Sequence, residues 1–553
     1  MPFKFIDLVR KKDLWAIFTL TLMGVLLFYG PPFFRDLWAP DEPRYAAIVK
    51  EMVLTGNWLL PHLNGALYTE KPPLYFWLTA LSALLWGNFS NAALIFPTLI
   101  SALGTLIITY FFGKKLFNRT VGFLGALVLA TGALFLGVAQ IVRMDMLLTF
   151  LLTSALFCFY QGYHRSTGKT LYYLAFYLLL ALATPIKGPV AILLPSLVGT
   201  LYLTWHRDLK ALWGMRPLTG FLLISLVLSP WLIAIVHQAG WEYLRILVIK
   251  QNLGRAYNSF SHKEPFYFYL GRFPMDFLPW SPFLMGALTY YAGALVGHSR
   301  SDRSQKLRDR ILFLMIWFGT VFIFFSLMSG KLEIYLLPLY PAASLIVGRF
   351  WYEAFEGQTK DPWFKKCFSM SGLLLWIVFL LAGILILLDI GPRVHELPNR
   401  AASALFLGAG VLGLSSWRFN QKGIAFSGII AFMILLLAYS TWYLVPVINA
   451  QASLRPLGDE LARLRTDHAK IGLYKYDKPS YYFYTGSYLT MLKSPEELMA
   501  FLSSEGRVLC VLEEREFKDL RRDLHISVYV LGSVEVGRRK LVIISQYPPR
   551  PVL

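Results

Sequence analysis

The sequence predicts a mainly α-helical, polytopic membrane protein with about 13 transmembrane helices, interfacial helices in the first outer loop and a C-terminal soluble α/β domain. Of its 553 residues, 56% are hydrophobic and only 16% are charged, whereas about a quarter of residues are charged in soluble domains. Apolar runs long enough to cross a bilayer recur from Leu14 to Val445. Residues 448–553 have an ordinary soluble composition. We therefore divide the chain into a transmembrane domain, 1–447, and a soluble α/β domain, 448–553.

The formal net charge of +20 does not indicate a nucleic-acid partner. The excess Lys and Arg residues are spread over loops between apolar runs, which is typical of the positive-inside rule. Anionic lipids are natural partners for such a chain.

The apolar segment 72–86 is the difficult part of the topology. It is about 15 residues long, short of the ~20 that a span needs, so we interpret it as an interfacial helix. This interpretation places Lys114, Lys115 and Arg119 on the inner side of the membrane. The predicted spans then cover residues 14–34, 91–113, 120–139, 145–163, 171–186, 188–205, 217–237, 279–297, 311–328, 334–351, 369–390, 401–417 and 423–446.

Alternating these spans makes the inner loops basic, which supports the topology. The N-terminus is then cytoplasmic and the soluble domain lies outside. Three segments that the basic-loop rule does not explain also meet on the outer side: residues 35–71, 142–145 and 238–278. The inner basic residues are Arg165, Lys169, Arg207, Lys210, Arg216, Arg300, Arg303, Lys306, Arg308, Arg310, Arg418 and Lys422.

The soluble domain shows short strands and amphipathic helices. We expect strands at 471–474, 508–512, 527–530 and 541–544, and helices at 454–464 and 495–502. Ser494 followed by Glu497 predicts a capped start for the second helix.

The first outer loop contains the sequence Ala-Pro-Asp-Glu-Pro-Arg-Tyr at residues 39–45. Carboxylates at membrane depth are costly and usually functional or paired, so Asp41 is a candidate catalytic acid. Its alternative role is to cap the helix that starts near Pro43, and the two roles are compatible. Glu42, Arg44 and Tyr45 are candidate cavity residues.

The same loop ends with Tyr68-Thr69-Glu70-Lys71-Pro72-Pro73, where the proline pair fixes an extended backbone. Lys71 then lies at headgroup level, where its ammonium group suits a phosphate. The structural alternative is that Lys71 extends its ammonium group to the membrane–water interface without binding a ligand.

Asp145 follows Arg143 at the start of a predicted span, and Lys187 lies in an outer break between two spans. A carboxylate at a helix N-terminus is favoured by the helix dipole, so a structural role for Asp145 stays open. Its predicted location on the same face as Asp41, Glu70 and Lys71 favours a functional one.

Two later segments add candidates on the outer face. In the long loop 238–278, Arg255 can bind a phosphate bidentately, and His262 is a candidate acid–base or metal-binding residue, although a lone His is more often structural. Between two later spans, Lys331, Glu333 and Tyr335 suit a headgroup site.

Together, these segments resemble the aminoarabinose lipid A transferases, within the polyprenyl-phosphate-dependent GT-C class that includes the protein O-mannosyltransferases. The resemblance rests on Ala-Pro-Asp-Glu-Pro-Arg-Tyr, Tyr-Thr-Glu-Lys-Pro-Pro, Arg-Met-Asp, Ser-Gly-Lys-Leu-Glu-Ile-Tyr-Leu-Leu-Pro and the soluble tail, in that order. It covers nearly the whole chain.

The resemblance implies a donor of undecaprenyl phosphate carrying 4-amino-4-deoxy-L-arabinose, and lipid A phosphate or another membrane acceptor. It implies a multi-pass protein of a Gram-negative inner membrane, and a link to polymyxin resistance. We expect a monomer. Asp41 and Asp145 resemble the essential acids of this family, and Lys71, Arg255 and Tyr335 resemble its donor-phosphate ligands. Tyr45 and Tyr68 resemble its cavity tyrosines.

A divalent metal ion is the one cofactor that the resemblance suggests. Glu70 resembles a residue that holds a metal ion in a relative, and His262 is the other candidate ligand. The sequence reads Lys250-Gln251-Asn252 where a partnering His is expected.

The predicted reaction is a single inverting displacement, in which an acceptor phosphate attacks the sugar and polyprenyl phosphate leaves. The chain contains no Gly-rich nucleotide loop, which agrees with a lipid-linked donor. The nearest alternative is the same chemistry with another sugar or acceptor, including protein O-glycosylation, where Asp41 becomes a general base. A lipid transporter and a sensor that uses the tail for binding are the rivals from other classes.

Overall fold

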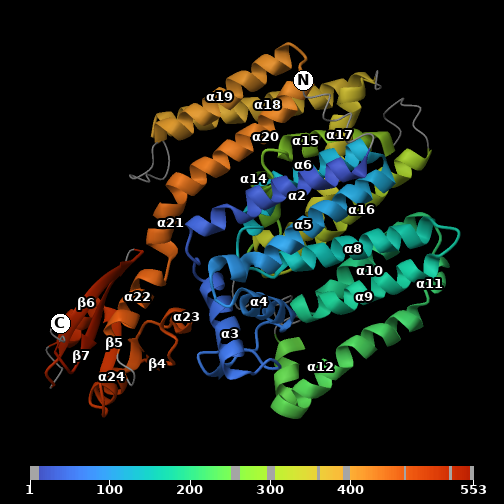
Figure 1. Ribbon diagram of the computed structural model, residues 1–553. Helices are drawn as coiled ribbons and strands as arrows, with labels where there is room; N and C mark the ends of the chain where they lie inside the picture. The colour runs from blue at the N-terminus through green and yellow to red at the C-terminus, as the bar shows by residue number, and fades with distance from the viewer. Residues whose placement is uncertain are drawn as a thin grey trace.

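The structure is a computed structural model that describes residues 12–248, 250, 262–295, 305–357, 361–389, 399–465, 469–521, 526–537 and 539–548. A large helical bundle is followed by a small C-terminal sheet domain, which lies beside α3 (Figure 1). The mainly α-helical membrane fold with a small α/β domain is therefore confirmed.

The helices of the bundle follow the predicted apolar runs closely. They are α2 (Asp13–Tyr29), η1 (Pro31–Phe34), α3 (Asp41–Thr55), α4 (Leu74–Trp86), α5 (Asn91–Leu116), α6 (Arg119–Ala130), α7 (Ala133–Val138), α8 (Asp145–His164), α9 (Lys169–Lys187), α10 (Val190–Trp205), α11 (Ala211–Gly214), α12 (Pro217–Arg245), α14 (Phe268–Asp276), α15 (Ser281–Leu295), α16 (Gln305–Leu327), η3 (Glu333–Leu339), α17 (Tyr340–Glu356), α18 (Pro362–Leu387), α19 (Asn399–Arg418), α20 (Lys422–Tyr439), η4 (Ser440–Leu444) and α21 (Val445–Ala452).

Within the described ranges, nine helices are long and apolar enough to cross a bilayer, so the chain is a multi-pass membrane protein. The count of about 13 crossings stays a prediction, because α6 and α10 are shorter apolar helices. Two predicted boundaries are wrong. The run 120–139 breaks after Ala130 into α6 and α7, and α12 continues past residue 237 to Arg245 through a kink at Gly240.

Ion pairs at one end of the bundle support the interfacial interpretation of α4. Asp13, at the start of α2, lies 2.7 Å from the Nζ atom of Lys114 at the end of α5 and 2.9 Å from the Nε atom of Arg119. The start of α2 and the end of α5 are in contact, so they lie on the same side of the membrane. The chain between them must then cross the membrane an even number of times. A membrane-spanning α4 would place them on opposite sides, and its 13 residues are too few to cross.

Glycine residues allow the central helices α5, α6 and α17 to pack closely. A Cβ atom added at Gly122 would lie 2.3 Å from the carbonyl oxygen of Tyr110, and one at Gly348 would lie 2.6 Å from the backbone nitrogen of Gly125. Small residues at helix contacts are typical of membrane bundles, where van der Waals packing replaces the hydrophobic effect.

The C-terminal domain is a five-stranded mixed sheet of order β4-β3-β5-β7-β6. Strands β4, β3 and β5 are parallel, and β7 is antiparallel to both β5 and β6. Four of its strands overlap the predicted ones, whereas β4 was not predicted. The elements are α22 (Arg455–Leu464), β3 (Lys470–Tyr474), η5 (Pro479–Tyr481), α23 (Tyr482–Thr485), β4 (Leu489–Leu492), α24 (Pro495–Leu502), β5 (Val508–Glu513), α25 (Glu514–Leu520), β6 (Tyr529–Val536) and β7 (Arg539–Ser545).

Helices cover both faces of this sheet, so alternate side chains of β5 enter different cores. Leu509 and Val511 pack with Leu457 of α22, whereas Val508 and Cys510 pack with Leu498 of α24. The predicted helices 454–464 and 495–502 are confirmed. The Ser494 hydroxyl accepts a hydrogen bond from the Glu497 N–H, and the Glu497 carboxylate accepts one from the Lys493 N–H.

The C-terminal domain is joined to the first loop of the bundle by several contacts. The Asn449 side-chain oxygen, in α21, accepts hydrogen bonds from the backbone N–H of Asp36 at 3.1 Å and the indole N–H of Trp38 at 2.8 Å. Arg455 lies 3.3 Å from the Asp36 carboxylate. The short hairpin of β1 (His62–Leu63) and β2 (Ala66–Leu67) contacts β4. The predicted domain boundary at 447/448 falls within α21.

Candidate active site

A buried ion pair fixes the backbone that leads into α3. The Arg35 guanidinium binds the Glu42 carboxylate with two hydrogen bonds, the Nη1 bond being 2.6 Å long, and both side chains are almost fully buried. Glu42 also accepts hydrogen bonds from the backbone N–H groups of Trp38 and Val142. Each Glu42 oxygen is therefore bound within the protein, so this candidate cavity residue braces the first loop against the 140–142 turn.

Asp41, the residue before Glu42, is partly exposed and is held by two arginines. Its carboxylate forms an ion pair with Arg44 one turn along α3, and its other oxygen lies 2.7 Å from the Nη1 atom of Arg143. Position 41 opens α3, where the helix dipole favours a negative charge. The ion-pair and helix-dipole roles of Asp41 thus coexist, whereas the predicted capping role is wrong, because α3 starts at Asp41 itself and its N-cap position is Pro40.

Arg143 joins the two candidate acids, because its Nε atom also lies 3.2 Å from Asp145. Asp145 is the first residue of α8, and its side chain is only 5% exposed. Its second oxygen binds the Nζ atom of Lys187. The structure therefore brings Asp41 and Asp145 into one network, in agreement with their predicted location on the same face of the membrane.

Lys187 reaches this network from the last residue of α9, after a kink at Pro185. Its Nζ atom lies 4.2 Å from the ring centre of Tyr335, in η3. The Lys187 cation thus stands between a carboxylate and an aromatic face, and only 14% of its side chain is exposed. Lys71, at the end of the first loop, is close enough to contribute a favourable charge interaction with Asp145.

Arg44 extends the network towards the second motif of the first loop. Its Nη1 atom lies 3.7 Å from the Glu70 carboxylate, and the rings of Tyr45 and Tyr68 both pack against Phe76. Burial raises the pKa of both tyrosines, so their hydroxyl groups stay protonated. Among the residues that the structure describes, the buried Tyr68 hydroxyl and Arg44 Nε–H have no hydrogen-bond partner.

Lys331 and Glu333 differ from each other in their surroundings. The buried Lys331 ammonium donates hydrogen bonds to the carbonyl oxygens of Glu264, at 2.8 Å, and Met328, and so holds residues 262–264 against 329–331. Glu333 lies 3.0 Å from Arg272 in α14, which is also 3.4 Å from Asp276. Glu333 is thus accessible to a substrate, whereas Lys331 is committed to backbone carbonyls.

The candidate metal ligands do not form a metal site. In the part of the chain that the structure describes, no three His, Cys, Asp or Glu side chains are arranged to hold an ion. Glu70 faces Arg44 instead, and His262 is exposed on a left-handed backbone with φ 57°. The described residues provide no three-ligand metal site, so we derive no step through a metal ion. Arg255 lies outside the described residues.

The sequence reasoning left Arg143 and Asp276 out of the candidate site. Arg143 stands two residues before Asp145, and a basic residue in that tripeptide was the available signal. Asp276 is separated from Glu333 in sequence, and only the packing of α14 against η3 brings Arg272 to both carboxylates. Burial raises the pKa of Asp276 to about 6, which Glu333 assists and Arg272 opposes.

This arrangement suits the binding of an anionic group such as a phosphate. Arg44, Arg143 and Lys187 supply positive charge, and arginine stays charged at every relevant pH. The unpartnered Tyr68 and Arg44 donors lie close to these charges and are available to a polar ligand, because buried polar groups normally have partners.

Sequence comparisons identify relatives with related chemistry. The family described as dolichyl-phosphate-mannose-protein mannosyltransferase matches residues 70–233. The chain is 29% identical over 347 residues to an undecaprenyl phosphate-alpha-4-amino-4-deoxy-L-arabinose arabinosyl transferase of Proteus mirabilis, which covers 62% of this chain and 60% of that relative. It is 28% identical over 446 residues to the Yersinia enterocolitica transferase of that name, covering 77% and 76% of the two chains.

Solved structures show the same fold over almost the whole chain. ArnT from Cupriavidus metallidurans bound to undecaprenyl phosphate aligns with a TM-score of 0.77 and 19% identity, over 95% of this chain and 97% of that one. The Archaeoglobus fulgidus oligosaccharyltransferase aligns with a TM-score of 0.53 and 12% identity, over 94% and 69%. The predicted resemblance is therefore confirmed: the chain is similar in sequence to the aminoarabinose transferases and has the fold of these membrane glycosyltransferases.

Proposed function

We propose that this protein is an inverting glycosyltransferase that moves 4-amino-4-deoxy-L-arabinose from undecaprenyl phosphate to a lipid A phosphate on the periplasmic face. The observation that supports this most is the network of Asp41, Arg143, Asp145 and Lys187 at one end of the bundle. The names of the relatives supply the sugar and the carrier. Since the chain aligns with 60% of the Proteus relative, the substrates rest on this proposal.

In the proposed reaction, an oxygen of the acceptor phosphate attacks the anomeric carbon of the sugar. The bond from that carbon to the acceptor oxygen forms as the bond to the undecaprenyl phosphate oxygen breaks. The electron pair of the broken bond leaves with undecaprenyl phosphate, which gains one negative charge. An acceptor phosphate is already anionic, so the step needs no general base.

Cations stabilise the leaving phosphate in this scheme. Lys71 and Arg143 border Asp145, and Lys187 lies between Asp145 and Tyr335. Positive groups fixed before the reaction stabilise developing charge without reorganising, which is where such sites gain most of their rate. Arg255 is also proposed as a ligand of the donor phosphate, on the basis of the sequence alone.

The two acids act on the sugar and on the cations around it. Asp41 and Asp145 orient Arg143 and Lys187, and their negative charge stabilises the positive charge that develops on the sugar ring. Arg44 and Tyr68, whose unpartnered donors are buried next to Glu70, are proposed to bind sugar or phosphate oxygens.

A second candidate is transfer to a hydroxyl group of a protein. The match of residues 70–233 to a mannosyltransferase family favours it. A hydroxyl acceptor needs a base, and Asp41 is the partly exposed carboxylate that we propose for that role. Both oxygens of the Asp41 carboxylate are already bound, one by Arg44 and one by Arg143, so the geometry favours a phosphate acceptor.

The remaining assignments belong to the same proposal. The protein is placed in the inner membrane as a monomer, with a cytoplasmic N-terminus and residues 448–553 in the periplasm. The soluble domain contacts the loop that ends at Asp41, so we assign it the role of holding that loop and admitting the acceptor.

Mass spectrometry of lipid A tests the proposal in cells that lack this protein, with and without its restoration. We expect an aminoarabinose-sized mass on the phosphate to disappear and return. The Asp41→Asn variant, at matched membrane abundance, should fail to restore it. If lipid A is unchanged, lipid A phosphate is not the acceptor, and the hydroxyl groups of proteins become the next acceptors to test.

A further inference from the structure

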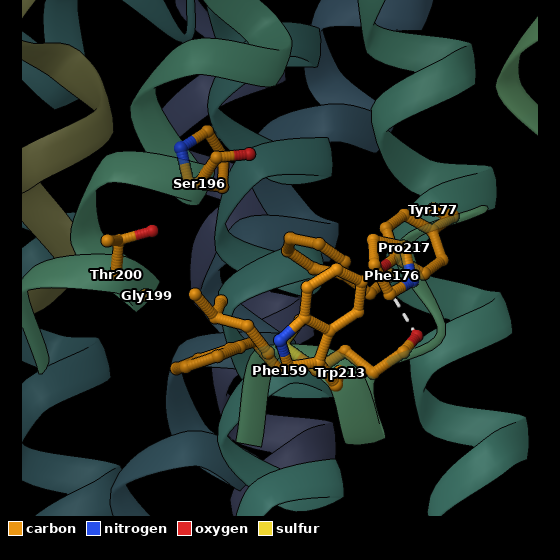
Figure 2. A pocket seen from close by; sticks show the side chains of 11 residues that line it. Phe159, Phe176, Tyr177, Ser196, Gly199, Thr200, Trp213 and Pro217 are labelled. Carbon is orange, nitrogen blue, oxygen red and sulfur yellow. Dashed lines mark hydrogen bonds between the residues drawn. The ribbon is translucent and has the colours of Figure 1, made fainter. Parts of the chain in front are cut away.

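A second site lies at the opposite end of the bundle from the candidate active site. Phe159 of α8 is about 21 Å along the helix from Asp145, at 1.5 Å per residue. Together with Phe176 of α9 and Gly199 of α10, it lines a cavity of about 410 Å³ (Figure 2). This volume is within the range of about 300–1,000 Å³ that is typical of ligand sites. Figure 1 shows α11, which helps to close the cavity, far from α3 and the C-terminal sheet.

The walls of this cavity are almost entirely apolar. Aromatic rings of Phe159, Phe176 and Trp213 surround it, and the Tyr177 hydroxyl is turned away to donate a hydrogen bond to the Met215 carbonyl oxygen at 3.2 Å. Ser196 and Thr200, one turn apart on α10, supply the polar groups of the lining. An apolar cavity of this kind does not hold water well, so a hydrocarbon chain is its natural occupant.

The segment that closes the cavity has the composition of a membrane interface. Trp205 and Trp213 are 65% and 78% exposed, as expected for aromatic side chains at headgroup level. Arg207, Lys210 and Arg216 are exposed nearby, and among the described residues none of these three has an acidic partner. The single carboxylate of this segment, Asp208, accepts a hydrogen bond from Tyr163 at 3.1 Å.

Arg216 stands next to the cavity itself, since Met215 and Pro217 on either side of it are lining residues. Its backbone, with φ 56° and ψ 61°, ends the α11 turn and begins α12. We propose that the cavity holds an acyl chain of an anionic phospholipid, whose phosphate group is bound by Arg216, Lys210 and Arg207. The charge of these residues selects an anionic headgroup, and the apolar lining of the cavity selects a hydrocarbon chain.

Undecaprenyl phosphate offers the same pairing of a phosphate with a hydrocarbon. The cavity is remote from Asp145 and Lys187, so this lipid site is independent of the proposed transfer reaction. Basic loops also set the orientation of membrane helices without binding a particular lipid. The experiment must therefore distinguish a specific lipid site from this general effect of charge.

Native mass spectrometry of the full-length purified protein tests the proposal, with phosphatidylglycerol, phosphatidylethanolamine and undecaprenyl phosphate as probes. We expect phosphatidylglycerol to bind at least about tenfold more tightly than phosphatidylethanolamine, because three cations face its phosphate. The triple variant Arg207→Gln, Lys210→Gln, Arg216→Gln should remove this preference. The triple variant Lys365→Gln, Lys366→Gln, Arg418→Gln loses the same charge at exposed positions elsewhere and should keep it.

The cavity is tested by filling it. Thr200→Trp and, separately, Ser196→Phe should abolish the bound phospholipid, whereas Leu201→Trp, at a 43% exposed position on the same helix, should retain it. Two results would overturn the proposal: full phospholipid binding by both filled variants, or equal loss of preference in the two triple variants. Displacement of phosphatidylglycerol by undecaprenyl phosphate at equal concentration would assign the cavity to the donor lipid instead.

Discussion

The two ends of the helix bundle both contain clusters of charged groups, but the clusters are built differently. At the candidate active site, Asp41 and Asp145 are bound by Arg143 and Lys187, which lie at a loop and after a helix kink. At the opposite end, one cluster centres on Asp309, which lies 2.7 Å from the His206 imidazole and accepts a 2.7 Å hydrogen bond from the Tyr202 hydroxyl.

The two clusters differ in whether their cations carry a permanent charge. The cations of the active-site cluster are Arg and Lys, whereas those of the opposite cluster are His residues that are charged only when protonated. Buried polar groups without a hydrogen-bond partner among the described residues occur at both clusters: Tyr68 and Arg44 at the first, and His206 at the second. Charge at a helix end is therefore not by itself a sign of function. The kind of cation, permanent at one end and titratable at the other, is what separates the two clusters.

The largest expected effect is on transfer by Asp41→Asn and Asp145→Asn. Each should lower the rate by at least about 100-fold, the loss typical of removing one preorganised electrostatic group. Asp309→Asn is the matched change at the opposite end and should leave the specific activity of the folded protein unchanged. Transfer assays on equal amounts of folded protein measure both. Equal losses at the two ends would break the distinction between the clusters.

The next effect separates two neighbouring acids. Glu42→Gln should lower the free energy of unfolding by about 3–5 kcal/mol, because it leaves Arg35 charged and buried without its partner. Asp41→Asn should cost much less stability, since its side chain is 20% exposed. Thermal unfolding in detergent measures the two. The double variant Arg35→Met, Glu42→Leu should recover part of the loss, and a failure to recover would mean that the backbone hydrogen bonds of Glu42 dominate.

Much of this fold follows from local sequence. Helix length and hydropathy are properties of short segments, so helices occupy every predicted span, although the runs 14–34, 120–139, 334–351 and 423–446 are each divided between two or more elements. The break between Ala130 and Ala133 does not follow, because the run stays apolar through Thr131 and Gly132. Strand β4, with the sequence Leu-Thr-Met-Leu, was not predicted; it lies at the edge of the sheet and pairs with β3 alone.

The candidate site could be predicted as a set of segments but not as a set of contacts. Asp41, Asp145 and Lys187 meet because their helices end on one side, and topology alone predicts that. The bridging role of Arg143 and the attachment of Lys331 to backbone carbonyls depend on side-chain directions set by tertiary packing.

A smaller effect tests the link between the C-terminal domain and the site. Asn449→Leu should leave the Asp36 N–H and the Trp38 indole N–H without their acceptor, at a cost of about 1–3 kcal/mol. We expect faster hydrogen exchange at residues 36–42 and slower transfer, with the sheet domain still folded. Unchanged exchange and transfer would show that the domain does not brace the loop.

The smallest effect is a pH dependence from Asp276. Its pKa of about 6 is above the ordinary 3.8, so the native state binds this proton more tightly than the unfolded chain does. The resulting stabilisation is complete below about pH 4 and is lost as the pH rises through 6. Thermal unfolding across this range should show a shallow step that Asp276→Asn removes. A step of the same size in that variant would assign the proton to another group.

Reconstituted transfer tests the central claim most directly. Purified protein in liposomes is supplied with undecaprenyl phosphate carrying labelled 4-amino-4-deoxy-L-arabinose, together with lipid A, and the products are analysed by mass spectrometry. We predict labelled sugar on a lipid A phosphate with the wild-type protein and almost none with Asp41→Asn or Asp145→Asn. An intact donor with folded wild-type protein, or wild-type rates in both variants, would contradict the account.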